Sequence, residues 1–160
     1  MVLPALQRLL SRAGLPAPKR GEPATRVLGR RGERLAASHL RRQGYRVLAR
    51  NLRTPIGEAD IVCLAPDRRT VVIIEVKSRL RRPQPIDARD ISARRASAPA
   101  AEYSITARKR RKLLHLAQDI ARRRRWTDRP LRIDVVAVEW SDPRARPEIR
   151  HHPCAVTLND

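Results

Sequence analysis

The sequence contains few aromatic residues and few cysteines, and each shortage excludes a class of function. Two Tyr, two Trp and no Phe are too few for the base-stacking platform of a single-strand-binding protein. Cys63 and Cys154 belong to no CxxC or Cys/His ligand pattern, so we expect neither structural zinc nor a disulfide framework. We expect Cys63 to be a core thiol within a strand.

Long apolar segments are also missing. No apolar run reaches the roughly 18 residues that a membrane helix needs, so a transmembrane span is excluded. Near the start of the chain Arg8 interrupts the apolar residues, and no convincing cleavage site follows, so we do not expect a secretory signal. The cytoplasm is therefore the expected compartment. A length of 160 residues is typical of one domain.

Acidic residues are outnumbered by basic ones, 16 against 36, which gives a formal net charge of +20. Such an excess indicates a polyanionic partner, because each neutralised phosphate releases counterions. Nucleic acid is a better candidate than an anionic membrane surface, since no long basic amphipathic helix dominates the chain. The basic set is almost entirely Arg, a skew that a GC-rich genome also produces, so a purely compositional origin of the charge stays open.

The periodicity of apolar residues predicts an α/β fold in the order α-β-β-β-α-β. The short connections between the first three strands predict an antiparallel meander, and the long second helix predicts that the next strand pairs in parallel with an earlier one. Gly44 is expected to end the first helix, and Thr106 to cap the second. The predicted elements are a helix at 28–43, a strand at 45–53 with a break at 49–50, strands at 58–64 and 71–77, a helix at about 107–125, a strand at 131–140 and a short edge strand at 148–152.

Two segments follow neither period. Residues 1–25 contain linker-like Pro and Gly and are predicted to form a poorly ordered extension. Residues 80–104 are basic, contain several breakers and are predicted to form a long loop, and such loops in compact domains are usually functional or disordered. We therefore expect a single domain over 26–158 that carries this loop.

Charged residues follow directly on the most apolar strand. The β-branched run Val71–Ile74 leads into Glu75-Val76-Lys77, and alternation along a strand places Glu75 and Lys77 on one face. Asp60 lies near the start of the preceding strand, which the turn at 66–69 should fold back beside this one. The sequence therefore predicts that two carboxylates and a lysine meet at one edge of the sheet.

Such a group suits phosphodiester hydrolysis, which needs charge neutralisation and a water made nucleophilic. Carboxylate oxygens favour Mg²⁺ or Mn²⁺, so Asp60, Glu75 and the Val76 carbonyl are the predicted ligands. Lys77 is predicted to orient or deprotonate the attacking water, or to stabilise the pentacovalent phosphate. Glu33 on the first helix is either a further ligand or only a stabiliser of the first turn of that helix.

Simpler explanations exist for the same residues. Glu75 and Lys77 can form an ion pair at a strand end, and Asp60 can cap a turn. Asp134 is expected to pair with an Arg instead of joining the site, and His151 and His152 are expected at the surface. The candidate nucleic-acid contacts, which are otherwise ordinary solvated residues, are Arg79, Arg108, Lys109, Arg111 and Lys112.

Several segments together resemble the YraN family, a group of small, poorly characterised bacterial proteins assigned to the restriction-endonuclease-like PD-(D/E)xK superfamily. The resemblance runs in order over about residues 26–140 and is carried by Gly29–Ala36, Gly44-Tyr45, Asn51–Arg53, Gly57–Val62, Ile73–Arg79, Lys109 and Arg132–Val138.

The resemblance implies a restriction-endonuclease-like three-layer core, with a central mixed sheet flanked by helices. It also implies nuclease roles for Glu33, Asp60, Glu75 and Lys77, and similarity to archaeal Holliday-junction resolvases. Many such nucleases form dimers, so a homodimer is an open expectation. The segment 80–104 and the first 25 residues depart from the family pattern.

The first functional hypothesis is therefore a Mg²⁺- or Mn²⁺-dependent endonuclease that hydrolyses DNA, with branched DNA as a candidate substrate. The alternatives are a nucleic-acid-binding module without catalysis and a basic protein associated with RNA or a ribonucleoprotein. Salt-sensitive binding without a metal-dependent product would favour the second hypothesis, and tighter binding to RNA than to DNA would favour the third.

Overall fold

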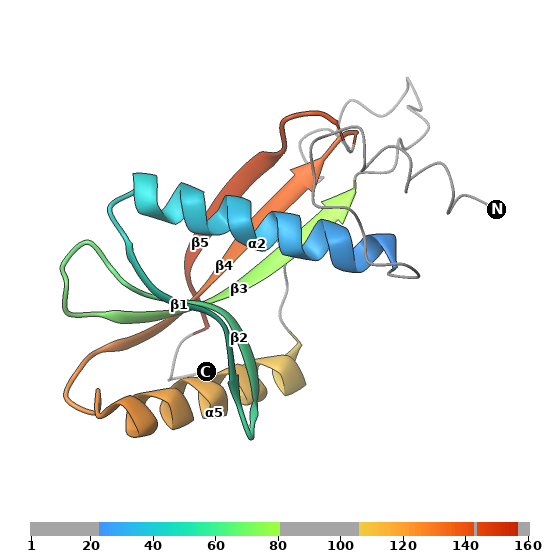
Figure 1. Ribbon diagram of the computed structural model, residues 1–160. Coiled ribbons are helices and arrows are strands. Elements are labelled where there is room, and N and C mark those ends of the chain that lie inside the picture. Colours follow the sequence, from blue (N-terminus) through green and yellow to red (C-terminus); the bar gives the residue numbers. More distant parts are fainter. Residues whose placement is uncertain (1–22, 81–105, 143, 157–160) are drawn as a thin grey trace, which may run out of the picture.

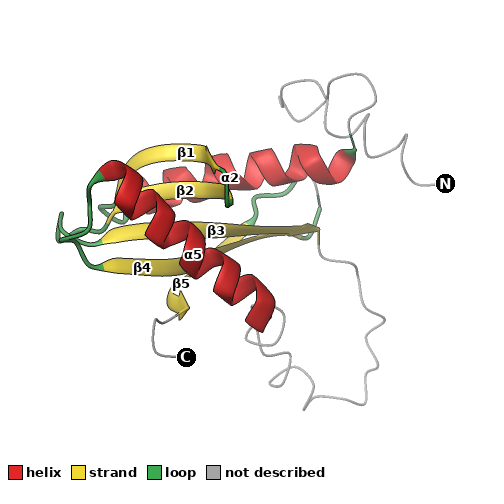
Figure 2. Ribbon diagram, turned by 90° about the horizontal axis from the view of Figure 1, so that it is seen from below, coloured by secondary structure: helices red, strands yellow, loops and turns green. Residues whose placement is uncertain are grey.

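The computed structural model describes residues 23–80, 106–142 and 144–156. In this part of the chain one five-stranded sheet lies between two helices (Figure 2), which confirms the expected three-layer α/β fold. The predicted loop at 80–104 lies outside the described residues except for its first residue, and most of the predicted extension at 1–25 does too. The elements are α2 (Ala24–Arg42), β1 (Arg46–Thr54), β2 (Gly57–Leu64), β3 (Val71–Leu80), α5 (Ala107–Arg124), β4 (Leu131–Trp140) and β5 (Glu148–Val156).

The strands follow one another across the sheet in the order β1-β2-β3-β4-β5 (Figure 1). β1, β2 and β3 form the predicted antiparallel meander. β3 and β4 are parallel and in register from Val71↔Leu131 to Leu80↔Trp140, with α5 in the connection between them, as predicted. At its start the central strand β3 is covered on both faces, by α2 over Val72 and Ile74 and by α5 over Val71 and Ile73, which explains why Val71–Ile74 are all buried.

Helix α2 begins at Ala24, four residues before the predicted start at 28. Pro23 stands at the N-cap, and Val27 is buried, so the first turn continues the apolar stripe that faces the sheet. The helix ends before Gly44, as predicted, because Gly44 has a φ of +86° that favours glycine. The earlier start places Glu33 in the middle of the helix, so its interpretation as a stabiliser of the first turn is wrong.

Helix α5 matches its prediction closely. The Thr106 side chain accepts a hydrogen bond of 3.2 Å from the backbone nitrogen of Lys109 and so caps the helix. Arg125 follows the last turn with a φ of 56°, and the preceding arginines lie at the negative end of the helix dipole. The buried residues of the helix are Leu113, Leu116, Ala117, Asp119, Ile120 and Ala121.

Strand β5 is longer than predicted, since it runs from Glu148 to Val156 instead of ending at 152. Pro153 looks like a strand breaker, but it lies at an irregularity where the register with β4 shifts between Ile133 and Val135. Cys154 has a φ of 54° there, and its backbone N–H donates a hydrogen bond to the side chain of Asp134 instead of to the backbone of β4. Pairing then resumes at Val156.

Two hydrophobic clusters hold the three layers together. Leu40 and Trp140 belong to the cluster between α2 and the sheet, together with Cys63, the core thiol expected from the sequence. Leu116 and Ile120 belong to the cluster under α5. Burial and the neighbouring Asp134 raise the pKa of the Cys63 thiol to about 12, so this thiol is inert. Neither of the helices in the described ranges is long and apolar enough to cross a membrane.

Candidate active site

The candidate site lies where β2 and β3 separate. β2 pairs with β3 only from Ile61↔Ile74 to Leu64↔Val71, whereas β3 continues to Leu80 beside β4. Beyond this point β2 bends away from β3 towards α5 (Figure 1). We call this point of strand separation the β2–β3 fork, with Asp60 on one arm and Glu75–Lys77 on the other.

Asp60 is the residue at which β2 changes direction. Ala59 packs under α5 while Ile61 packs under α2, although residues two apart in a regular strand face the same side. The Asp60 carboxylate points into the fork, where its Oδ2 accepts a 2.7 Å hydrogen bond from the backbone nitrogen of Val76. The acid therefore occupies the hydrogen-bonding position that a continuing β2 would have filled.

Glu75 lies beside two lysines. Its Oε1 is 3.2 Å from the Nζ of Lys77 and 3.0 Å from the Nζ of Lys109, which reaches across from α5. The Glu75 side chain is 12% exposed, against 33% and 39% for the two lysines. Glu75 and Lys77 thus share the face of β3 that α5 covers, and the lysines are the more accessible partners.

The electrostatics of the fork connect three acids. Burial raises the pKa of Asp60 to about 6, opposed by the Val76 hydrogen bond and supported by the negative charges of Glu75 and Glu33. Lys109 acts in the opposite direction and lowers this pKa. A carboxyl group with a raised pKa beside other carboxylates is typical of functional sites. Acids with a purely structural role are usually paired with cations or hydrogen-bond donors that keep them ionised.

Glu33 approaches the fork from α2, on the other side of the sheet from α5. Its Oε2 accepts a 2.7 Å hydrogen bond from the Nδ2 of Asn51 on β1. Asn51 has a φ of 50°, a conformation that Asn adopts more readily than other non-glycine residues. No role is predicted for Asn51 from the sequence, although an Asn in the middle of a strand is unusual and is a signal for one.

The donors in the fork suit a hard cation. Asp60 and Glu75 supply carboxylate oxygens, and the Val76 carbonyl faces the fork because the N–H and C=O of one strand residue point to the same side. Among the described residues, no group of three or more His, Cys, Asp or Glu side chains is arranged to hold a metal ion. The remaining ligands would therefore have to be water or substrate oxygens, as is common for Mg²⁺.

The sequence profile described as uncharacterised protein family UPF0102 matches residues 32–138. A UPF0102 protein of Syntrophotalea carbinolica is 38% identical over 132 residues, which cover 82% of this chain and 93% of the relative. A UPF0102 protein of Pseudomonas aeruginosa is 40% identical over 127 residues, which cover 79% and 89%. The chain belongs to the UPF0102 family. This membership confirms the resemblance to the YraN family.

The part of this UPF0102 protein that matches the family profile includes Glu33, Asp60, Glu75, Lys77 and Lys109. The family description and the names of these relatives state no activity, substrate or cofactor.

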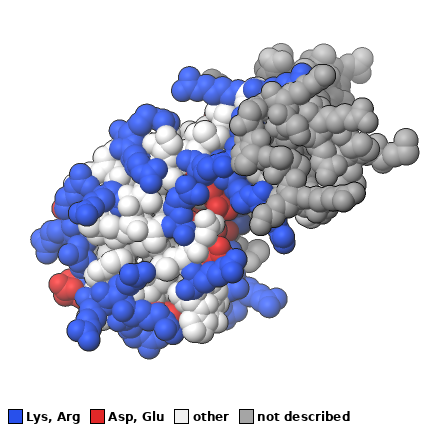
Figure 3. Space-filling model, in the orientation of Figure 1, with Lys and Arg blue, Asp and Glu red and all other residues white. Residues whose placement is uncertain are grey.

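The predicted nucleic-acid contacts of the UPF0102 protein divide into two groups. Arg79, Arg108, Arg111 and Lys112 are exposed, the last three on α5. The Lys112 side chain lies against Gly57 at the β1–β2 turn, and its Cε would be 3.2 Å from a Cβ added to Gly57. Lys109 instead points into the fork. Figure 3 shows Lys and Arg over much of one face, with a few acids between them.

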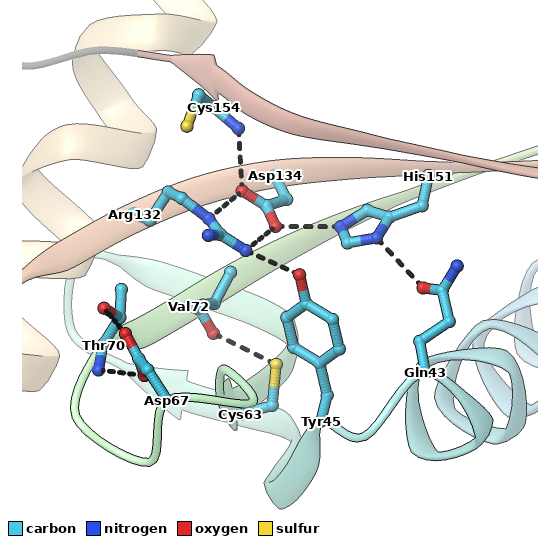
Figure 4. Close-up of polar contacts among 10 residues, drawn as sticks. All are labelled: Gln43, Tyr45, Cys63, Asp67, Thr70, Val72, Arg132, Asp134, His151 and Cys154. Atoms are coloured by element: carbon cyan, nitrogen blue, oxygen red, sulfur yellow. Dashed lines mark hydrogen bonds and ion pairs between the residues drawn. The ribbon is translucent and has the colours of Figure 1, made fainter.

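A second polar group lies on the opposite face of β4 from the fork (Figure 4). Asp134 is fully buried and contacts Arg132 at 2.9 Å and His151 at 2.8 Å, and Arg132 also donates a 2.7 Å hydrogen bond to the Tyr45 hydroxyl. Burial acts to raise the pKa of Asp134, but the hydrogen bonds from His151, Arg132 and Cys154 lower it overall.

The Arg partner predicted for Asp134 is therefore present. The surface position predicted for His151 is wrong, because its side chain is only 7% exposed and its Nδ1 also lies 3.2 Å from the Gln43 side chain. Asp134 is level with Ile74 in the sheet and points to the α2 side, so it does not join Glu75.

Proposed function

We propose that this UPF0102 protein is a divalent-cation-dependent nuclease that hydrolyses phosphodiester bonds in nucleic acid, with DNA as the expected substrate and branched DNA as a candidate. The observation that carries the proposal is the β2–β3 fork, which holds the Asp60 carboxylate against the Val76 amide, next to Glu75 and Lys77. Two acids and a lysine in a partly buried opening fit phosphodiester hydrolysis better than they fit a stabilising ion pair.

Each residue has a separate task in this proposal. Asp60, Glu75 and the Val76 carbonyl would hold Mg²⁺ or Mn²⁺, which when bound neutralises phosphate charge and lowers the pKa of water. Lys77, as the ammonium ion that pairs with Glu75, orients the attacking water or stabilises the negative charge that builds on the phosphate. Glu33, held by Asn51, adds negative charge on the α2 side and orders water there.

The net charge of +20 supports a polyanionic substrate. Arg108, Arg111 and Lys112 are exposed on the helix that also brings Lys109 to Glu75. A phosphate backbone bound along α5 would therefore be led to the fork. These contacts position a substrate without reading its sequence, which suits a nuclease that recognises shape more than base sequence.

The decisive experiment compares cleavage of linear, single-stranded and four-way-junction DNA by wild type and by Glu75→Gln, with Mn²⁺ or with a chelator. We expect wild type to cut at least one substrate only with Mn²⁺. Glu75→Gln and Lys77→Ala should lower the rate by about a hundredfold or more while binding changes little. Glu58→Gln is the control, because Glu58 is an exposed acid on the same strand as Asp60, paired with Arg53.

A non-catalytic nucleic-acid-binding module is the second candidate, and a basic RNA- or ribonucleoprotein-associated protein is a variant of it. The observation in its favour is that two lysines already neutralise Glu75 while no third His, Cys, Asp or Glu completes a metal-binding group among the described residues. This candidate predicts salt-sensitive binding with no product at any Mn²⁺ concentration, and tighter binding to RNA if it acts in a ribonucleoprotein. Equal cutting by wild type and Glu75→Gln would contradict the proposed site.

A further inference from the structure

We infer that Lys109 is a second lysine of the catalytic site. Its ammonium group forms an ion pair with Glu75 when no cation is present, and moves to contact a phosphate oxygen of the substrate when the cation binds. The inference rests on the proposed function and adds a residue and a sequence of events to it. Sequence reasoning assigned Lys109 to a general nucleic-acid-binding surface, together with neighbours that remain exposed.

Two ammonium groups contact one carboxylate oxygen of Glu75. Lys77 and Lys109 approach the same oxygen, Oε1 of Glu75, at 3.2 and 3.0 Å. One ammonium group neutralises one carboxylate, and a second ammonium on the same oxygen adds repulsion between the two lysines. The double contact is therefore more than is needed to stabilise Glu75 as a structural ion pair.

Lys109 lies at an unfavourable position in its helix. Its backbone N–H is bonded to the Thr106 cap, which puts it in the first turn of α5, a turn without any acidic residue. A lysine there is disfavoured by the positive end of the helix dipole. Helix stability therefore does not explain this lysine, whereas its contact across the fork to Glu75 does.

The charge balance of the fork also favours movement of one lysine. When ionised, Asp60, Glu75 and Glu33 carry three negative charges, against two positive charges on Lys77 and Lys109. A divalent cation bound to Asp60 and Glu75 would turn this net negative charge into a net positive one, so the repulsion between the cation and the lysines favours movement of one lysine away. An incoming phosphodiester supplies a negative charge to which that lysine can move.

Lys109 is better suited to this movement than Lys77. Lys77 lies two residues from Glu75 on the same strand face, so the strand keeps the two side chains close. Lys109 comes from a different element, its side chain is 39% exposed, and the neighbouring Arg108 and Arg111 are exposed on the same helix. Lys109 therefore lies between the exposed basic residues of α5 and the acids of the fork.

The test measures Mn²⁺ binding without nucleic acid by calorimetry, for wild type, Lys109→Gln and the matched control Lys112→Gln. Lys112 lies on the same helix, is exposed, and is placed against the turn at Gly57. We expect Lys109→Gln to bind Mn²⁺ about tenfold or more tightly, because the competing ammonium is gone. Lys112→Gln should bind Mn²⁺ as wild type does.

Wild type, Lys109→Gln and Lys109→Arg are then assayed for cleavage at saturating Mn²⁺. We expect Lys109→Gln to cut about a hundredfold more slowly despite its tighter metal binding, and Lys109→Arg, which keeps the charge, to recover part of both wild-type values. Circular dichroism melting checks that each variant is folded.

The outcomes separate the two proposals. If wild type binds Mn²⁺ and cuts while Lys109→Gln binds Mn²⁺ no more tightly, the role of Lys109 is overturned and the nuclease proposal stands. If Lys109→Gln binds more tightly and still cuts at the wild-type rate, transfer to phosphate is overturned. If wild type neither binds Mn²⁺ nor cuts, both proposals fail together.

Discussion

The backbone amide of Val76, on β3, donates a 2.7 Å hydrogen bond to the Asp60 carboxylate, on β2. This bond joins the two strands just beyond their last ladder pair, Ile61↔Ile74. It satisfies a strand N–H that has lost its neighbour, and it fixes a carboxylate beside Glu75 and Lys77. The same arrangement keeps Asp60 away from water, which raises its pKa to about 6.

The first prediction concerns the stability of the cation-free protein with pH. Because the folded-state pKa of Asp60 is about 6 against an ordinary 3.8, the folded protein retains a proton that the unfolded chain has lost between these values. Stability from this group is full below about pH 4 and is lost as the pH rises through about 6. Asp60→Asn should therefore become more stable than wild type at neutral pH, by up to about 3 kcal/mol.

The measurement is urea denaturation of both proteins in chelator, at several values between about pH 4 and 7.5. Asp67→Asn is the control, because hydrogen bonds from Thr70 lower the pKa of Asp67 to about 2, so this group is ionised in the folded state throughout the range and in the unfolded chain above about pH 5. If the difference in the free energy of unfolding between wild type and Asp60→Asn stays constant with pH, burial does not raise the pKa of Asp60.

Much of the fold follows from the sequence because its signals are local. The apolar stripe of α5, its Thr106 cap and the run Val71–Ile74 were each enough to place an element. The predicted end of β5 at 152 is too early, because the strand continues through an irregularity in which the Asp134 side chain, 20 residues from Cys154, accepts the Cys154 N–H. A hydrogen bond between residues so far apart leaves no local pattern in the sequence from which it could be predicted.

The site was predictable in part for the same reason. Glu75 and Lys77 are neighbours on one strand, so alternation alone puts them together. The contacts that sequence reasoning missed are Lys109 with Glu75, Asn51 with Glu33, and His151 with Asp134, each between different elements. The helical period predicts which residues of α5 face inward. It does not predict the contact of Lys109, in the first turn of the helix, because that contact depends on where β2 and β3 separate.

The second prediction concerns Gly32, where α2 lies close to Ser78 of β3. A Cβ added at Gly32 would lie 1.8 Å from the Ser78 Oγ and 3.0 Å from the Ser78 Cβ. Gly32→Ala should therefore push α2 away and destabilise the protein by about 1–3 kcal/mol, despite the better helix propensity of Ala. Cleavage should fall too, because the next residue is Glu33. Thermal melting and the cleavage assay measure the two effects.

Gly29→Ala is the matched control on the same helix, because a Cβ added at Gly29 meets nothing within 4 Å. There the gain in helix propensity should stabilise the protein by about 0.5–1 kcal/mol. Ser78→Gly should relieve much of the Gly32→Ala effect. Equal effects of Ala at the two glycines would mean that the close approach to Ser78 does not restrict the helix.

The third prediction concerns the buried Asp134. Asp134→Ala removes the partner of the Arg132 guanidinium and the His151 ring together, and leaves the Cys154 N–H without its acceptor (Figure 4). Breaking a buried ion pair on one side costs about 3–5 kcal/mol, since the remaining charge stays buried and unpaired. Chemical denaturation measures this loss.

Glu58→Gln provides the comparison, because the Glu58 and Arg53 side chains are 40% and 84% exposed and such pairs contribute about 1 kcal/mol at most. A loss for Asp134→Ala as small as that for Glu58→Gln would contradict the structural role of the buried network.

The last prediction concerns the salt dependence of nucleic-acid binding along α5. Each duplex phosphate neutralised by the protein contributes about 0.9 to the slope of log affinity against log salt. Arg108→Gln, Arg111→Gln and Lys112→Gln should each weaken binding to all sequences alike and reduce the slope by about one contact. Arg124→Gln, at the far end of the same helix, is the control and should leave the slope unchanged. Fluorescence anisotropy over a salt series, in chelator to prevent cleavage, gives the slopes. An equal reduction for Arg124→Gln would mean that the basic charge acts as a diffuse field and not through contacts near the fork.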